Sequence, residues 1–146
     1  MEISGRLEHA ERLDSLGLDI DDYLIFGSGP LAIRGWRPNR NIDILVASDT
    51  WKLIRGPKCD KVVWHFERES TLELCEGHVS LHYVCPPFKN TEELIERGEI
   101  IDDRNYMRLI DLMVAKEYSG TFSDSNDIRL ILKKSAEEEL KRHSKA

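Results

Sequence analysis

The chain has 146 residues, of which 40% are hydrophobic, and its 27 acidic and 21 basic residues give a formal net charge of −6. This length predicts a single domain over residues 1–146, and the acidic balance excludes a protein that coats long nucleic acids. Because no apolar run is long enough to span a membrane and the first sixteen residues are too charged for a signal peptide, we expect a cytoplasmic protein that does not enter membranes.

Apolar periodicity, capping residues and turn residues divide the first half of the chain into elements. We expect helices over residues 4–17, 31–35 and 48–54 and strands over residues 23–26 and 42–46. In the second strand the alternation places Asp43 and Leu45 on the side opposite the isoleucines. The first strand runs into the turn Gly27-Ser28-Gly29-Pro30, which leads to the short helix.

The second half begins with strands and ends with helices. We expect strands over residues 61–66, 71–75 and 79–84, and helices over residues 90–98, 106–118 and 124–143. Asn90 and Glu93 form a capping box for the first of these helices, and Met107, Ile110 and Val114 form the apolar side of the second. Clustered strands followed by helices predict an α+β, or mixed α/β, domain rather than a doubly wound sheet.

The turn after the first strand has residues suited to binding an anion. Gly27 and Gly29 allow the backbone to approach a ligand, and the Ser28 hydroxyl could bond a phosphate oxygen. Positions 41 and 43 are two residues apart on the next strand and point to the same side. Carboxylates at both positions would hold hard divalent ions such as Mg²⁺, an arrangement that suits phosphoryl or nucleotidyl transfer.

This pattern resembles the signature of the DNA polymerase β-like nucleotidyltransferase superfamily, in its small "minimal" branch. The first match is Phe26-Gly27-Ser28, twelve residues, and then Asn41-Ile42-Asp43-Ile44. The second comprises the leucine-rich helix that ends in Lys116, then Gly120, and then Ser123-Asp124 with Asp127-Ile128. The resemblance covers the chain from Tyr23 to about Leu132. It implies a mixed sheet of about four to five strands flanked by helices, with further helices at the C-terminus.

The resemblance also implies site residues, from which this chain departs at one position. Asp43 would bind Mg²⁺ and take part in catalysis, but the first carboxylate of the pair falls on Asn41, which offers an oxygen without a charge. Losing that charge weakens metal binding by a few kcal/mol, and a barrier about 4 kcal/mol higher slows a reaction roughly a thousandfold. A third carboxylate is expected at Glu73, unless the strand that supplies it is the one containing Ser80 and His82.

Basic residues near the motifs are candidates for binding a nucleotide. Arg34, Arg37 and Arg40 could hold a triphosphate, or they could lie in a solvated loop. Lys116 could reach a phosphate, or it could pair with Glu117 or Asp111 at the surface. Together with Gly27 and Ser28, we take Arg34, Arg40 and Lys116 as the expected nucleotide-binding residues.

Three functional hypotheses follow. The first is an enzyme that uses Mg²⁺ to transfer a nucleoside monophosphate from an NTP, with ATP expected, to an acceptor hydroxyl. The second is a catalytically inactive member that binds a nucleotide or a protein partner, such as an antitoxin-type component. The third is an α+β scaffold with neither property. Asn41 counts against the first hypothesis.

Overall fold

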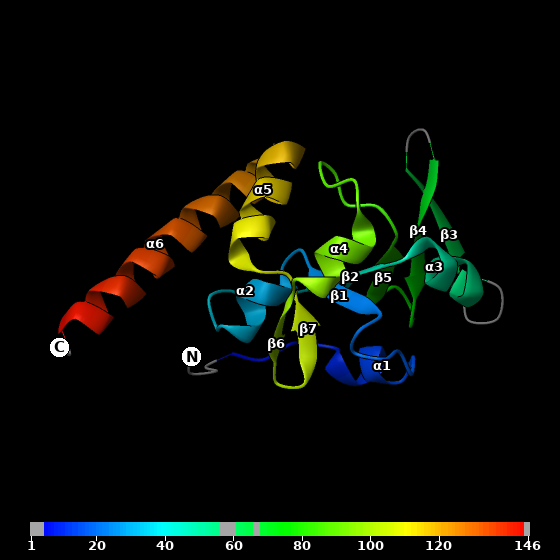
Figure 1. Ribbon diagram of the computed structural model, residues 1–146, viewed down its shortest axis with the longest axis horizontal. Helices are drawn as coiled ribbons and strands as arrows, with labels where there is room; N and C mark the ends of the chain where they lie inside the picture. The colour runs from blue at the N-terminus through cyan, green and yellow to red at the C-terminus, as the bar shows by residue number, and fades with distance from the viewer. Residues whose placement is uncertain (1–4, 56–60, 66–67, 145–146) are drawn as a thin grey trace.

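A mixed seven-stranded sheet forms the centre of the computed structural model, which describes residues 5–55, 61–65 and 68–144 (Figure 1). The strand order is β3-β4-β5-β2-β1-β7-β6. The strands are β1 (Tyr23–Phe26), β2 (Ile42–Val46), β3 (Lys61–His65), β4 (Arg68–Leu74), β5 (Val79–His82), β6 (Glu99–Ile101) and β7 (Arg104–Tyr106). β2 pairs antiparallel with β1 and parallel with β5, so it lies in the interior of the sheet.

Helices cover both faces of this sheet. They are α1 (Ala10–Asp14), α2 (Gly29–Ile33), α3 (Ser48–Arg55), α4 (Thr91–Glu96), α5 (Leu109–Ser119) and α6 (Phe122–Ser144). In Figure 1, α1 lies below the sheet and α4 and α5 lie above it, while α6 extends away to the left. No helix in the described part of the chain is both long enough and apolar enough to cross a membrane.

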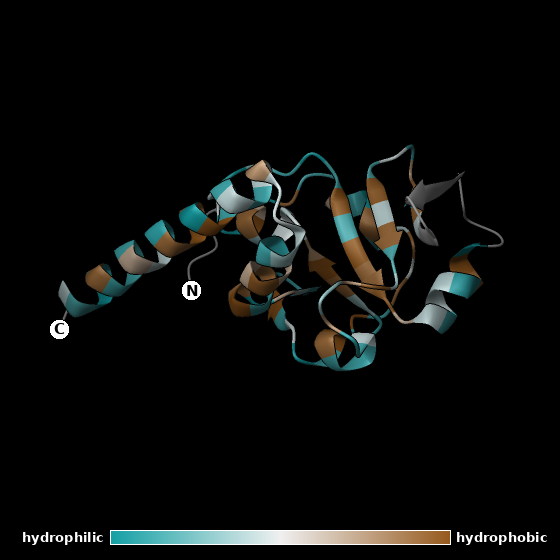
Figure 2. Cartoon of the chain, turned by 90° about the horizontal axis from the view of Figure 1, so that it is seen from above, coloured by the Kyte–Doolittle hydropathy of each residue, from teal (hydrophilic) through white to brown (hydrophobic). Residues whose placement is uncertain are grey.

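The alternation along the strands divides the core between the two faces. Ile42, Ile44 and Val46 of β2 belong to one apolar cluster, which includes residues of α1 and α3. Leu45 belongs to a second cluster, built with residues of α4, α5 and α6. Figure 2 shows the strands as mostly hydrophobic and the helices as alternating between polar and apolar residues. Asp43 therefore points to the face covered by α4 and α5, as the pattern in Ile42–Val46 predicts.

Local sequence explains the ends of two helices. The Asn90 side chain accepts a hydrogen bond from the backbone N–H of Glu93 at 3.0 Å, which caps α4 as predicted. Gly120 ends α5 in the left-handed conformation, with φ of 64°, and its N–H donates to the Lys116 carbonyl. This turn allows α6 to fold back beside α5.

The predicted α+β class with C-terminal helices is confirmed, but the sheet is larger than expected. The expected strands are present, whereas β6 and β7 were not predicted. Each has only three residues, and the turn between them uses Asp102 and Asp103 at φ of 51° and 63° in place of the usual Asn-Gly signal. Position 66, the predicted end of the third strand, and the Gly56-Pro57 stop lie outside the described residues.

Two predicted helix details are wrong. The first helix covers only Ala10–Asp14 of the expected residues 4–17, and position 4 lies outside the described residues. Met107 is buried, but Ile110 and Val114 are 64% and 40% exposed. The physical reason is that α5 begins at Leu109, so Met107 lies before the helix and does not share its periodicity.

Candidate functional site

Asp43 is a carboxylate in the middle of the sheet. In the sheet register it lies beside Phe26 of β1 and Ser80 of β5. Its side chain is 36% exposed although both flanking residues, Ile42 and Ile44, are fully buried. The carboxylate therefore reaches solvent on the α4 and α5 side while the rest of its strand is covered.

A histidine on the neighbouring strand is the direct partner of Asp43. His82 Nε2 lies 3.2 Å from Asp43 Oδ1, and His82 Nδ1 lies 3.2 Å from Thr71 Oγ1. One neutral tautomer satisfies both contacts, because Nε2–H can donate to Asp43 while Nδ1 accepts from the Thr71 hydroxyl. Thr71 is buried, and the Phe26 ring packs edge-on against the imidazole at 5.0 Å. The three side chains form a row across β4, β5 and β2.

Gly27 packs directly against this carboxylate. Its φ is +68°, and a Cβ atom at this position would lie 2.6 Å from Asp43 Oδ2. A glycine is therefore required for two reasons: the left-handed backbone conformation and the space that Asp43 occupies. The sequence predicts that a ligand approaches the backbone at Gly27. In the structure the Asp43 carboxylate occupies that space.

The other expected acidic positions do not join Asp43. Asn41 is exposed and precedes β2, in a bend. Glu73 lies in register with Ser80, so β5 separates it from β2. The strand beside Asp43 is thus the one that contains Ser80 and His82. Among the described residues there is no group of three or more His, Cys, Asp or Glu side chains arranged to hold a metal ion.

These residues do not fit the Mg²⁺ site that the resemblance implies. Such a site needs at least two carboxylates whose oxygens face one ion. Asp43 is a single carboxylate, and one of its oxygens is already hydrogen-bonded to a histidine. Neither Asn41 nor His82 adds a negative charge.

The expected nucleotide-binding residues differ in their burial and in their partners. Ser28 is the N-cap residue of the five-residue α2, without a side-chain capping bond. Arg34 is buried; it donates to the Pro30 carbonyl at 2.8 Å and forms an ion pair with Glu99. Arg40 is exposed. Of these two arginines, only Arg40 is directed to the surface.

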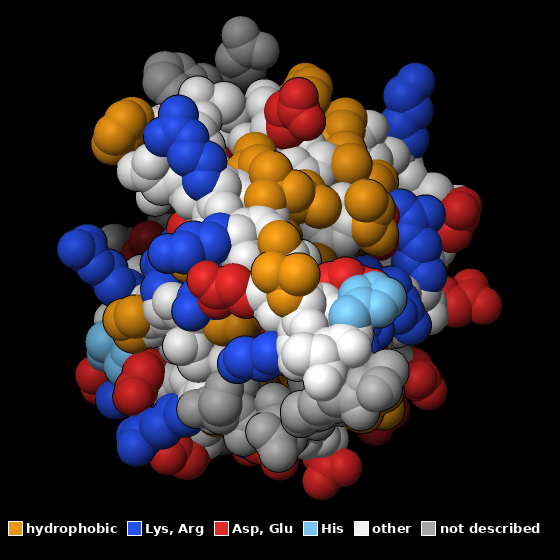
Figure 3. Space-filling model, turned by 90° about the vertical axis from the view of Figure 1, so that its left-hand side faces the viewer, with side chains coloured by type: hydrophobic (Ala, Val, Ile, Leu, Met, Phe, Trp, Pro, Cys, Tyr) orange, Lys and Arg blue, Asp and Glu red, His pale blue; other side chains and the backbone are white. Residues whose placement is uncertain are grey.

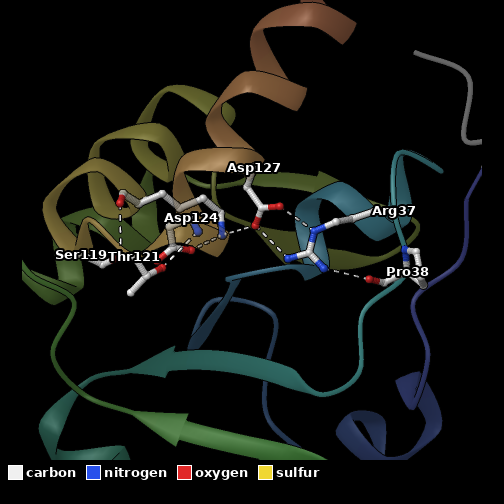
Figure 4. Close-up of polar contacts among 7 residues, drawn as sticks. Arg37, Pro38, Ser119, Thr121, Asp124 and Asp127 are labelled. Carbon is white, nitrogen blue, oxygen red and sulfur yellow. Dashed lines mark hydrogen bonds and ion pairs between the residues drawn. The ribbon is translucent and has the colours of Figure 1, made fainter.

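Lys116 is buried and belongs to an ion network that connects three segments of the chain. Its Nζ lies 2.9 Å from Asp127 Oδ2 and 3.1 Å from Asp124 Oδ1. Arg37 binds the same Asp127 through two hydrogen bonds of 2.7 and 2.8 Å, and Ser119 donates to Asp124 (Figure 4). We call Arg37, Lys116, Ser119, Asp124 and Asp127 the ion network. The partners of Lys116 are thus two carboxylates of α6, and neither Glu117 nor Asp111 is among them.

The ion network makes the stability of the folded state depend on pH. Burial by itself raises the pKa of Asp127, but the hydrogen bonds from Arg37 and Lys116 outweigh it and leave that pKa below its ordinary value. The pKa of Asp124 is lowered as well: burial opposes the shift, while Ser119 and Lys116 produce it. Because both carboxylates have a lower pKa when folded, their contribution to stability is present above the unfolded pKa of about 3.9 and is lost at lower pH.

We therefore expect the free energy of unfolding to fall as the pH drops below about 4. Urea unfolding at several pH values between 6 and 3 measures this decline. The Asp127→Asn variant should be less stable at pH 6 and should lose less stability on acidification than the unmodified chain. Equal acid dependence in both proteins would contradict this assignment.

Cys85 is a buried thiol close to the same face of the sheet. Burial, and then the charges of Asp111 and Asp43, raise its pKa to about 11. At pH 8 roughly one thiol in a thousand is then ionised, and only the thiolate reacts readily. We expect iodoacetamide to modify Cys85 at least about 100-fold more slowly in the folded protein than in urea, as followed by mass spectrometry. Equal rates in the two conditions would contradict the buried placement.

Comparison of the chain with protein-family models, with curated proteins and with solved structures gives no match. The fold and the site are those of a mixed α/β domain with an Asp–His–Thr row across β2, β5 and β4.

Two contacts of the site were not predicted from the sequence. The contact between His82 and Asp43 depends on the parallel pairing of β2 with β5, which a single sequence does not specify. The Arg37–Asp127 pair joins positions far apart in the chain. The spacing of Lys116, Asp124 and Asp127 was a usable signal, because a lysine near the end of one helix faces acids in the first turns of the next.

Proposed function

We propose that this chain is a non-catalytic nucleotidyltransferase-like protein that acts by binding a protein partner. The observation that carries the proposal is the hydrogen bond between His82 Nε2 and Asp43 Oδ1. It occupies the one carboxylate that remains of the expected metal-binding pair, and Asn41 lies exposed outside the strand. A site with a single carboxylate that is already hydrogen-bonded favours binding of a protein partner over metal-dependent nucleotidyl transfer.

The placement of the basic residues favours a protein over a nucleotide as the ligand. Arg34 pairs with Glu99, and Lys116 pairs with Asp124 and Asp127. Each of these cations would have to leave a carboxylate before binding a phosphate, which costs several kcal/mol for buried pairs. A single exposed arginine, Arg40, would hold a triphosphate only weakly.

Exposed apolar side chains supply contact area for a protein partner. Ile110, Val114 and Tyr118 are 64%, 40% and 65% exposed and recur every four residues along α5. This spacing puts them on one side of the helix. Apolar residues grouped in this way are typical of surfaces that bind proteins.

The direct test is a nucleotidyl-transfer assay. We expect the purified chain to release no pyrophosphate from ATP with Mg²⁺, and the Asn41→Asp variant to release none either, because His82 still pairs with Asp43. Isothermal titration with a non-hydrolysable ATP analogue is expected to show no saturable binding. Mg²⁺-dependent turnover by the unmodified chain would overturn the proposal and establish the enzyme.

The enzyme remains the second candidate because of one observation. The Asp43 side chain keeps 36% of its surface exposed, beside the turn that contains Gly27. If the double variant Asn41→Asp, His82→Asp binds Mn²⁺, detected by electron paramagnetic resonance, while the unmodified chain does not, then these two positions account for the lost metal site.

A further inference from the structure

The C-terminal half of α6 extends beyond the rest of the molecule. The helix has 23 residues, and Ile131 is its last buried one. From Leu132 to Ser144 each residue is exposed except Lys134, which is half-buried. In Figure 1 this segment runs outward to the C-terminal end without a neighbouring element. An isolated helical segment this short is only marginally stable in water.

A stripe of exposed apolar residues runs along this segment. Leu132 and Leu140 are 56% and 69% exposed, and Ala136 lies between them at four-residue spacing. Leu140 comes nine residues after the buried Ile131, which is two and a half helical turns and therefore the opposite side of α6. Figure 3 views the molecule from the end toward which α6 projects, where hydrophobic side chains reach the surface among charged ones. Residues of the chain's own core therefore do not cover the stripe.

We infer that α6 pairs with α6 of a second copy of this chain, in antiparallel orientation about a two-fold axis near Ser135. With this register Leu132 lies between Ala136 and Leu140 of the second copy, and the same contacts repeat on the other side of the axis. The stripe residues of the two helices then alternate evenly along the interface. Ala136 near the centre allows the helices to approach closely. The inference goes beyond the proposed function and is independent of it.

Charge explains why the occupant is a second copy in antiparallel orientation. Lys133 and Glu137 are four residues apart on the same flank of the stripe. Reversing one helix places Lys133 beside Glu137 of the second copy and Glu137 beside its Lys133. In a parallel pair this flank of the two helices lies on opposite sides of the interface, so neither ion pair forms. Glu137 is already 3.7 Å from Lys134 of its own helix, so it would lie between two cations. Antiparallel helices also bring opposite ends of their dipoles together.

The interface is small, so the dimer is expected to depend on concentration. Sedimentation equilibrium of the full chain between about 10 µM and 1 mM should show monomer and dimer in exchange. Leu140→Glu should weaken the dimer at least tenfold. The matched control is Leu53→Glu, since Leu53 is 76% exposed on α3, and it should leave the dimer unchanged. A monomer at all concentrations, or a dimer that Leu140→Glu does not weaken, would overturn the inference.

Two further measurements test the register. Lys133→Glu and Glu137→Lys should each weaken the dimer, and the two together should restore it, because the swap recreates both pairs. On oxidation Ala136→Cys should give a disulfide-linked dimer, while Glu138→Cys, on the other side of the helix, should not. Both variants retain the native cysteines, so a covalent dimer in both, or in neither, counts against the inference. These results do not depend on pyrophosphate release, so failure here and failure of the proposed function can be distinguished.

Discussion

Replacing Asp127 with alanine is expected to lower the free energy of unfolding by about 3 kcal/mol, because it removes a buried carboxylate shared by two cations and leaves Arg37 without its carboxylate and Lys116 with one carboxylate fewer. The Asp127 side chain is 5% exposed and binds two cations, of which Lys116 is 6% exposed and Arg37 is 35% exposed. Lys116 would keep only Asp124. Urea or thermal unfolding measures the change.

Two variants control this prediction. Glu139 pairs with His143 at 2.9 Å on the exposed part of α6, so Glu139→Ala is expected to cost less than about 0.5 kcal/mol. Combining Asp127→Ala with Lys116→Met also removes the buried cation that has lost this carboxylate, and the double variant should be more stable than the sum of the single changes predicts. A cost below about 1 kcal/mol for Asp127→Ala would show that the ion network contributes little.

Gly27→Ala is expected to destabilise the fold by about 2 to 3 kcal/mol. A left-handed conformation costs a residue with a Cβ about 1 to 2 kcal/mol. In addition, the new Cβ would lie 2.6 Å from Asp43 Oδ2, so the carboxylate must rotate and give up its hydrogen bond to His82. Loss of that bond adds about 1 kcal/mol. Chemical denaturation measures the stability, and the imidazole NMR signals of His82 report the broken contact.

Gly17 offers a matched control for the cost of the left-handed backbone conformation. Its φ is +69°, close to that of Gly27, but a Cβ there would meet nothing within 4 Å. Gly17→Ala should therefore cost only the backbone term. In an Asp43→Ala background the extra cost of Gly27→Ala should disappear. If Gly17→Ala and Gly27→Ala cost the same in the unmodified chain, Asp43 does not press against Gly27.

The sequence predicted the parts of the fold that depend on local pattern. Alternation in Ile42–Val46 located β2 and the side on which Asp43 lies, and the Asn90 cap located the start of α4. The pairing of β7 with β1 could not be predicted, because three-residue strands carry almost no periodicity and a parallel partner is set by tertiary packing. The start of α5 was misplaced because Met107 continues the apolar spacing without being helical.

The sequence predicted where the candidate site lies, but it did not predict most of the contacts within it. The Gly-Ser-Gly turn and Asp43 do lie together, since Gly27 touches the carboxylate. The choice between Glu73 and the Ser80–His82 strand depended on sheet order, which no local pattern encodes. The roles of Arg34 and Lys116 depended on acids distant in sequence, Glu99 for the first and Asp127 for the second.

The position of β1 has a consequence for synthesis on the ribosome. One edge of β1 is filled by β2, which follows it closely, but the other is filled by β7, whose Tyr106 pairs with Ile25 much later in translation. Until β7 emerges, the nascent chain has an apolar strand with an open edge, and unpaired edges are where chains associate wrongly. Between translation of Phe26 and of Tyr106 the nascent chain therefore carries an apolar strand with one unpaired edge, which is the kind of surface that chaperones cover.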